Sequence, residues 1–484
     1  MSQFRFQPVA RPLYGSWLNI FRANNSVPRA RTLLFIACST LFAQGCASES
    51  RITCMFDLTD PAATADKSAW RGAQLAREMP QPEWAGQQKL DWSRSESFDN
   101  FPQQLWPREA QAQESRWKRV KIAALPTSAD SEALRRAALR ERERGSQIAI
   151  GYTTTELATE GIAAFTNTSA NDRAPFLVVG ITDPSFIERA GERTFSVSIS
   201  DDAQAVAAAE FMMDHWGGQC VIVVDSQDQR MSAMGQHLVR SLQTLGGMAV
   251  SILDVRHPDF VASLQQAIAA HEDVRAIYAA IGSDLVSTVL PVVRETCPSL
   301  PIMGCDTFDV AATDEAIQGA TSDVYFSAQA WFGEDAAIEA TRFASYYRMT
   351  YRQEPTAEAA LAFDAANIAL FAYVKASRSD PSARPNGAAL AYEIASLVSF
   401  PGATGRISYR HGAIPMKDVW MVRVQEGKRS LASSLMADRR KAYGISDVAT
   451  VPDDNSEDSP ESSLESSLES SLESSQEPAP RREP

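Results

Sequence analysis

Two short loops in this chain carry groups that could bind an anion. Thr154 and Thr155 lie between a predicted strand and the start of the following predicted helix. Gly180 and Thr182 follow the next predicted strand and precede another helical segment. Hydroxyl and main-chain N–H groups at such junctions can hold a carboxylate, because they are donors beside the positive end of a helix dipole. Thr and Ser also cap helices frequently, so helix capping is the alternative interpretation of the same residues.

The elements that position these loops alternate between short apolar runs and helical patterns, which predicts parallel βαβ units. Strands are expected at 52–58, 120–125, 147–150, 175–179, 195–199, 221–224, 249–253, 276–280 and 301–303. Helices are expected at 66–79, 130–144, 156–165, 201–216, 231–245, 260–271 and 285–296. Both hydroxyl-bearing loops therefore fall at the carboxyl ends of parallel strands, where open α/β sheets bind ligands.

The last part of the body has a different pattern. Two long helices, at 336–347 and 361–372, follow one another without an intervening strand. Two strands at 405–409 and 419–424 are then expected to pair as a hairpin that turns near His411. A polar and aromatic stretch earlier in the chain, residues 88–119, has no clear period and is interpreted as a surface insertion.

The N-terminal residues 1–46 are interpreted as an export signal. An apolar run at 33–42 follows two arginines and is too short to span a bilayer as a helix. The sequence Ala-Gln-Gly-Cys that ends at Cys46 resembles the lipobox of bacterial lipoproteins, in which the cysteine is acylated after cleavage. The alternative is a plain secretory peptide that is cut near Ala43 or Gly45.

Composition narrows the classes of function. The chain has 484 residues and a net charge of −14, so it is long enough for two or three domains and is unlike a protein that binds nucleic-acid phosphates. The sequence has no zinc-ligand spacing, P-loop, GxSxG or dinucleotide-binding motif, and no cofactor is predicted. Four body cysteines are interpreted as buried small apolar residues, namely Cys54, Cys220, Cys297 and Cys305.

The C-terminal residues 452–484 form an acidic, Ser- and Glu-rich tail. Its Glu-Ser-Ser-Leu repeats contain too few apolar residues to offset the entropy of ordering, so the tail is predicted to be disordered.

Several phrases of the sequence, in this order, resemble those of one known family. They are Phe-Asp-Leu-Thr-Asp-Pro-Ala at 56–62, Arg-Gly-Ala-Gln-Leu-Ala at 71–76, Ile-Gly-Tyr-Thr-Thr-Thr at 150–155, Gly-Ile-Thr-Asp-Pro-Ser at 180–185, Ala-Phe-Asp-Ala at 362–365 and Pro-Gly-Ala-Thr-Gly-Arg-Ile at 401–407. The chain resembles the type I periplasmic binding proteins over about residues 52–428, especially the leucine/isoleucine/valine-binding branch that serves ABC importers.

This resemblance implies an α/β fold of two Rossmann-like lobes with parallel central sheets, joined by a three-strand hinge. The first lobe would comprise 51–199 plus 330–400, and the second 200–327 plus 402–430. Ligand would bind in the cleft, and closure of the lobes would bury it.

The resemblance also implies roles for particular residues. Thr154, Thr155, Gly180 and Thr182 would hold the carboxylate of an amino acid. Asp306 follows the strand at 301–303 and matches the position of the acidic residue that receives the ligand's ammonium group. The alternative is that Asp306 is a turn or helix-capping residue.

Two positions depart from the family pattern. Gln229 and Arg230 stand where the branch has an aromatic–glycine pair, and residues 281–284 replace tyrosines. Gln229 is therefore a candidate ligand contact, and the ligand is expected to be an amino acid, an amide or another small polar solute. Arg230 either serves a second ligand carboxylate or is a solvated surface residue.

The predicted function is that of an exported, lipid-anchored solute-binding protein of the periplasm or cell envelope, working with ABC permease subunits. It is not predicted to be an enzyme, to bind nucleic acid, or to contact the membrane except through the lipid on Cys46. The alternatives are a ligand-sensing or envelope protein-interaction module on the same fold, without transport, and an enzyme on this scaffold to which no residue can be assigned.

Overall fold

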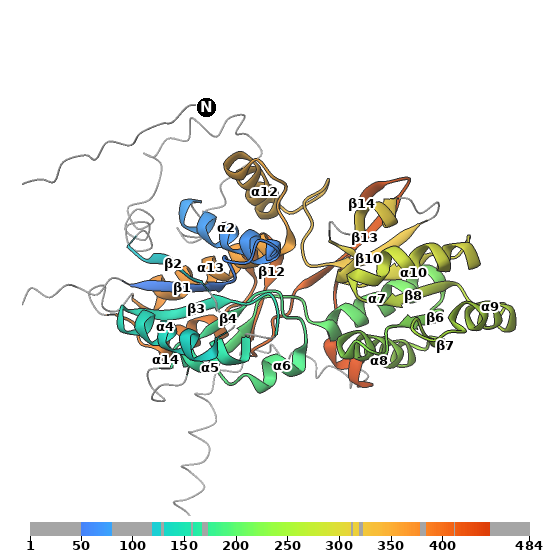
Figure 1. The fold of residues 1–484 in the computed structure, drawn as a ribbon, viewed down its shortest axis with the longest axis horizontal. Coiled ribbons are helices and arrows are strands. Elements are labelled where there is room, and N and C mark those ends of the chain that lie inside the picture. Colours follow the sequence, from blue (N-terminus) through green and yellow to red (C-terminus); the bar gives the residue numbers. More distant parts are fainter. Residues whose placement is uncertain are drawn as a thin grey trace, which may run out of the picture.

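The computed structural model describes residues 50–79, 119–126, 130–155, 158–166, 173–310, 313–318, 323–377, 384–410 and 412–445. These residues form two lobes that lie side by side (Figure 1). The predicted export signal with Cys46, almost all of the predicted insertion, His411 and the acidic tail lie outside the described residues.

The first lobe is built on a sheet of five parallel strands in the order β2-β1-β3-β4-β5. The strands are β1 (Arg51–Phe56), β2 (Lys121–Pro126), β3 (Ser146–Gly151), β4 (Phe176–Val178) and β5 (Thr194–Ser196). The strand order reverses between β1 and β3. In open parallel sheets this switch point is where ligands bind, because the loops that leave the two strands diverge there.

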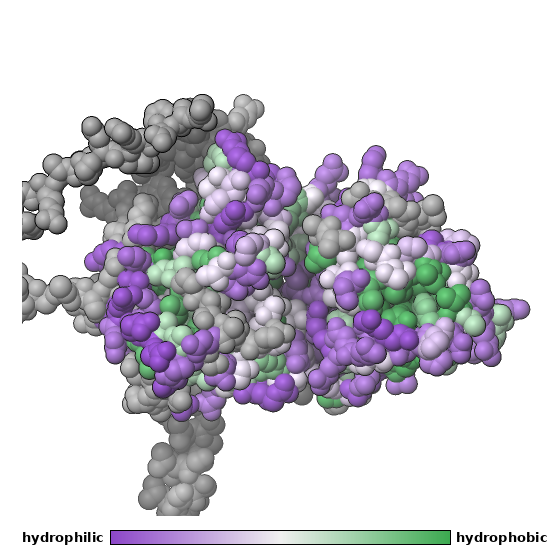
Figure 2. All heavy atoms as spheres, in the orientation of Figure 1, coloured by the Kyte–Doolittle hydropathy of each residue, from purple (hydrophilic) through white to green (hydrophobic). Residues whose placement is uncertain are grey.

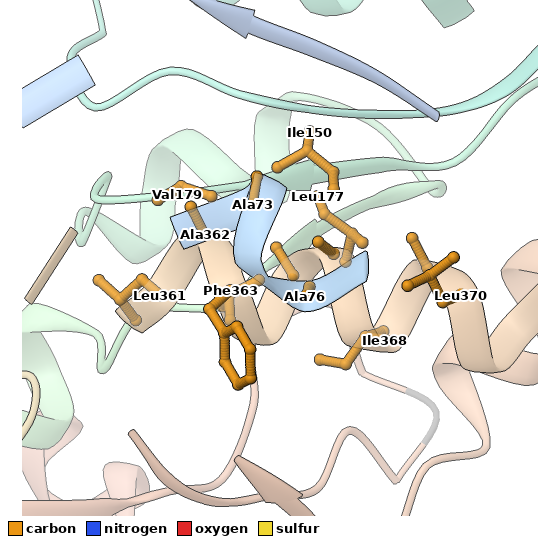
Figure 3. Close-up of a cluster of buried hydrophobic side chains, with 14 of the residues drawn as sticks. Ala73, Ala76, Ile150, Leu177, Val179, Leu361, Ala362, Phe363, Ile368 and Leu370 are labelled. Atoms are coloured by element: carbon orange, nitrogen blue, oxygen red, sulfur yellow. The ribbon is translucent and has the colours of Figure 1, made fainter. Parts of the chain in front are cut away.

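The helices of the first lobe cover both faces of its sheet (Figure 1). They are α2 (Thr64–Glu78), α4 (Ser131–Glu143), α5 (Ala158–Thr166), α6 (Pro184–Arg189), α12 (Ile338–Tyr351), α13 (Ala357–Ala376) and α14 (Gly387–Ala395). Figure 3 shows Ala73 and Ala76 of α2 meeting α13 near Ala362. Small side chains at this crossing allow the two helices to approach closely.

Helix α13 is long and apolar enough to cross a membrane by length and composition, but 83% of its most apolar stretch is buried within the fold. It is therefore the core helix of this lobe, in contact with the sheet residues Ile150 and Leu177.

The second lobe contains a sheet of seven strands in the order β14-β13-β10-β9-β8-β6-β7. They are β6 (Gln219–Val224), β7 (Met248–Asp254), β8 (Ala276–Ala280), β9 (Ile302–Gly304), β10 (Val324–Ala328), β13 (Asp418–Gln425) and β14 (Lys428–Met436). Strands β6 to β10 are parallel and repeat the strand order of the first lobe, with the switch point between β6 and β8. Strands β13 and β14 extend this sheet with antiparallel pairing.

The helices of the second lobe include α7 and α8, which lie nearest the first lobe (Figure 1). They are α7 (Asp201–Trp216), α8 (Gln229–Leu245), α9 (Phe260–Ala270), α10 (Ser283–Thr296), α11 (Asp314–Gln318) and the short 3-10 helices η5 (Asp306–Phe308) and η7 (Arg439–Tyr443). Folded structure thus continues past residue 430, where the second lobe was expected to end.

The predicted hairpin at 405–409 and 419–424 is wrong. Strand β12 (Gly405–Ile407) pairs with β11 (Phe400–Gly402), whereas β13 pairs with β14. The tight turn between β11 and β12 is fixed by the buried carboxylate of Asp364, which accepts hydrogen bonds from the N–H groups of Ala403 and Thr404 at 2.7 and 2.9 Å. Ser408, just after β12, forms an isolated antiparallel bridge with Met416, which precedes the second of the segments that were expected to pair.

Side chains tie the segments that connect the lobes to one another. The amide of Gln329, just after β10, accepts from the Ile199 N–H at 2.8 Å and donates to the Ile199 carbonyl at 3.0 Å. The ammonium group of Lys417, just before β13, donates to the Val197 carbonyl at 2.8 Å. Three connecting segments are therefore bound together at the hinge.

The four described cysteines are buried and unpaired, as predicted: Cys54, Cys220, Cys297 and Cys305. Burial raises the pKa of each thiol, to about 12 for Cys220 and about 11 for Cys305.

Candidate ligand-binding cleft

A hydrophilic hollow separates the two lobes (Figure 2), and it contains a cavity of about 450 Å³. The first lobe contributes residues 153–155, 180–185 and Arg189 to its walls, and the second contributes Asp201, 228–230, Ala233 and His237. These segments follow β3, β4 and β6, so both walls are built from the carboxyl ends of parallel strands.

The loop after β3 turns sharply at Tyr152, whose backbone is left-handed with φ of 64°. The buried Tyr152 ring stacks on Phe176, with centroids 5.9 Å apart. Gly161 makes room for this ring, because a β-carbon at that position would lie 1.8 Å from the Tyr152 hydroxyl oxygen. The turn leaves the side chains of Thr154 and Thr155 exposed at the cavity.

The loop after β4 packs against the loop after β3. Gly180 has φ of +87°, and a β-carbon there would lie 3.2 Å from the Thr153 α-carbon, so both conformation and space favour glycine. Its N–H donates to the Ser198 hydroxyl at 2.9 Å and is thus already used within the protein. The carbonyl of Thr182 accepts from the Asp201 N–H at 2.9 Å, which joins this loop to the start of α7.

The opposite wall begins at the first turn of α8. Asp228 caps this helix by accepting from the N–H groups of Arg230 and Met231 at 2.8 and 3.2 Å. Gln229 is exposed at the cavity. The structure therefore brings five of the six candidate ligand-binding residues to one cavity, namely Thr154, Thr155, Gly180, Thr182 and Gln229.

Arg230 is held by the buried carboxylate of Asp201 and by that of Asp306, which is 12% exposed, so its interpretation as a solvated surface residue is wrong. Its Nε lies 3.2 and 3.1 Å from the two oxygens of Asp201, and its Nη2 lies 2.8 Å from Asp201 Oδ1. The same Nη2 donates to Asp306 Oδ1 at 2.7 Å. The Arg230 side chain is 32% exposed, and it reaches the cavity from this ion-paired position.

Asp306, the sixth candidate, lies behind Arg230 and is fully engaged by the protein. In addition to the Arg230 contact, its Oδ2 accepts from the side-chain amides of Gln204 and Gln329 at 3.1 and 3.0 Å. Burial opposes ionisation, but the guanidinium and these amides hold the pKa of Asp306 below its ordinary value. For Asp201 burial outweighs Arg230 and raises the pKa, as expected when two acids share one cation.

A C-terminal segment reaches the rim of the cavity. We call residues 438–445 the C-terminal strap; it includes η7 and packs on α7 and α8. The Tyr443 ring lies 5.4 Å from the ring of His237, which lines the cavity. Sequence reasoning missed this contact, because the strap is short and polar and has no periodic pattern.

The polar groups that line the cavity can bind a ligand through hydrogen bonds and charge. It offers hydroxyl donors on one wall and a guanidinium with an amide on the other. Within the described ranges, no group of three or more His, Cys, Asp or Glu residues is placed to hold a metal ion.

Comparison with known proteins agrees with this architecture. A family profile described as periplasmic binding protein matches residues 127–429. No curated protein sequence matches the chain.

Solved structures share the two-lobed fold at low sequence identity. The leucine-binding protein LivK of Thermotoga maritima is 19% identical, with a TM-score of 0.57 over 80% of this chain and 98% of its own. LivJ of Streptococcus pneumoniae, in complex with isoleucine, is 18% identical, with a TM-score of 0.55 over 80% and 98%. A solute-binding protein of R. palustris, in complex with benzoate, is 14% identical, with a TM-score of 0.55 over 82% and 98%. The predicted fold is confirmed.

Proposed function

Because this chain belongs to the periplasmic binding protein family, we propose that it captures an amino acid or a similar small polar solute for an ABC importer. The observation that carries the proposal is the cavity between the lobes, whose walls come from both. A solute seated there contacts both lobes at once, so its binding energy favours the closed arrangement.

The cavity suits a small polar molecule with a carboxylate. Its volume of about 450 Å³ is in the range of small-molecule sites. The exposed hydroxyls of Thr154 and Thr155 supply donors for a carboxylate, with Thr182 and Gly180 shaping the adjoining loop and Gln229 facing them. Two of the similar structures are complexes with isoleucine and with benzoate, and each of these molecules has one carboxylate.

We place the protein outside the cytoplasm, as its family implies. The export signal at 1–46 and the lipobox-like sequence support a lipid anchor on Cys46, which would hold the binding lobes close to a membrane permease. Mass spectrometry of the membrane-extracted protein tests the anchor, since acylated Cys46 is then the N-terminal residue. An unmodified N-terminus at another residue contradicts it.

Thermal unfolding of the full chain against a panel of amino acids, amides and other small carboxylates tests capture. A ligand at a hundredfold over its Kd stabilises the folded state by about 2.7 kcal/mol. Thr155→Val, which removes one cavity hydroxyl, should reduce the shift. The matched control is Thr244→Val, because Thr244 lies at the far end of α8 and bonds the Arg240 carbonyl at 2.8 Å. A panel without any shift, or equal shifts in both variants, contradicts the proposal.

Uptake separates transport from sensing. Cells that lack the protein should lose high-affinity uptake of the solute that the panel identifies. If the purified protein binds that solute but uptake is unchanged, the chain serves a ligand-sensing or protein-interaction role without transport.

A further inference from the structure

Arg230 occupies the place where an ammonium group of a ligand was expected to bind. Its Nε and Nη2 are bonded to Asp201 and Asp306. Its Nη1 makes no hydrogen bond to any described residue and is accessible to solvent. The guanidinium therefore presents one free edge, and the residue that carries it lines the cavity.

The carboxylates of both acids behind Arg230 already accept hydrogen bonds from the protein on each oxygen. Asp306 receives Arg230 on one oxygen and two amides on the other. Asp201 receives Arg230 on both oxygens. A ligand ammonium could reach them only by displacing the guanidinium, which would leave a part-buried cation without its partners, a strongly unfavourable change.

The other acids on the cavity wall are engaged as helix caps. Asp183 accepts from the N–H and hydroxyl of Ser185, both at 2.8 Å, and its side chain is 40% exposed, so water screens its charge. Asp228 holds the first turn of α8, which includes the N–H of Arg230 itself.

We infer that the cavity selects small carboxylic acids that carry a hydrogen-bond acceptor, such as a hydroxyl or a second carboxylate, where an amino acid carries its ammonium group. This inference rests on the proposed function and narrows its solute class. The ligand carboxylate lies at Thr154 and Thr155, and the acceptor group faces the free Nη1 edge of Arg230. A cation at that place meets the like charge of the guanidinium, whereas an acceptor gains a charge-assisted hydrogen bond.

The guanidinium is fixed before any ligand arrives. Asp306 is held by Gln329, whose amide also binds the Ile199 main chain at the hinge. Gln204, which donates to Asp306, accepts from the Ser327 hydroxyl at 2.7 Å. Because these buried partners orient Arg230, little conformational entropy is lost when its free edge binds a ligand.

Calorimetric titration of the full chain with matched pairs tests the inference. The pairs are leucine with 2-hydroxy-4-methylpentanoate, phenylalanine with 3-phenyllactate, and aspartate with malate. In the pair that binds, the acid without nitrogen should bind at least about tenfold more tightly than its amino partner, the change expected from one such contact. If the amino acid binds as tightly or more tightly, the inference is overturned while capture stands. If no member of any pair and no panel compound binds, the proposed function fails as well.

Arg230→Met should weaken binding of the preferred acid by about ten- to a hundredfold and favour the amino partner, because Asp201 and Asp306 are then unmasked. The matched control is Arg256→Met. Arg256 pairs with buried Asp225 in the same two-point manner, at 3.1 and 2.8 Å, but does not line the cavity, so affinity should be unchanged. If circular dichroism shows that Arg230→Met is unfolded, Arg230→Lys, which keeps the charge and loses the forked geometry, replaces it. Unchanged affinity in the folded variant overturns the inference.

Discussion

The C-terminal strap should be a structural part of the second lobe, and Arg439→Met tests this. The Asp202 carboxylate is completely buried and accepts from Arg439 Nε at 2.9 and 2.8 Å, from the Ala203 N–H at 2.8 Å and from the Tyr443 hydroxyl at 3.1 Å. Burial opposes ionisation, yet Arg439 and the other donors hold the pKa of Asp202 below its ordinary value.

Removing one partner of a buried ion pair costs about 3–5 kcal/mol, because the remaining charge is left uncompensated. Asp202 keeps the bonds from Ala203 and Tyr443 in the variant, so the lower end, about 3 kcal/mol, is expected. The neighbouring Arg440→Met is the matched control. In its pair with Asp438 the two side chains are 57% and 30% exposed, and pairs in contact with water contribute about 0.2–1 kcal/mol.

Urea unfolding followed by circular dichroism at pH 7 measures both losses. The Arg439 variant should lose about 2 kcal/mol more of its free energy of unfolding than the Arg440 variant. Since the folded pKa of Asp202 is lowered, the stability from this pair is present above the ordinary value of 3.8 and is lost as pH falls below it. The difference between the variants should therefore shrink in acid. Equal losses at pH 7 would refute a structural role for the strap.

Two further substitutions test the loops and the hinge. Gly180→Ala should lower the free energy of unfolding by about 1–2 kcal/mol and weaken ligand binding, because the backbone there is left-handed and the loop lines the cavity. Gly246→Ala is the control, since Gly246 has nearly the same φ, +86°, and no atom within 4 Å of an added β-carbon. It should cost similar stability in unfolding and leave the affinity measured by calorimetry unchanged. Lys417→Met removes the cation that opposes the effect of burial on Asp364, so the pKa of this carboxyl should rise further in the folded variant. Its ionised form then destabilises the folded state more at pH 7 than at pH 5, where the carboxyl is protonated to a greater extent, and the loss of stability should be larger at pH 7. Equal losses in urea unfolding at the two pH values would contradict this.

Much of the fold could be predicted because its elements are locally encoded. The buried strands β3, β6 and β8 are continuous apolar runs between helical patterns, and their loops necessarily meet at one edge of a parallel sheet. The same reasoning located Thr154 and Thr155 in the loop after β3, whereas Gln229 became a candidate through the family resemblance.

The pairing of distant charged groups could not be predicted in this way. Arg230 binds acids that are 29 and 76 residues away in the sequence, so no local pattern distinguishes it from a solvated arginine. Strand β14 was missed because its side chains are mostly polar and it forms the edge of the sheet. The hairpin error arose because register depends on the buried anchor at Asp364, which lies far upstream.

Hydrogen exchange of the full chain, with and without the tightest-binding panel compound, tests whether the solute is held between the lobes. Amides at 153–155 and 180–185 in the first lobe and at 228–233 in the second should become protected together when the compound binds. Protection in one lobe alone would contradict it. So would protection only beside the separate cavity of about 540 Å³ that Arg173 and Arg193 line near α5 and α6.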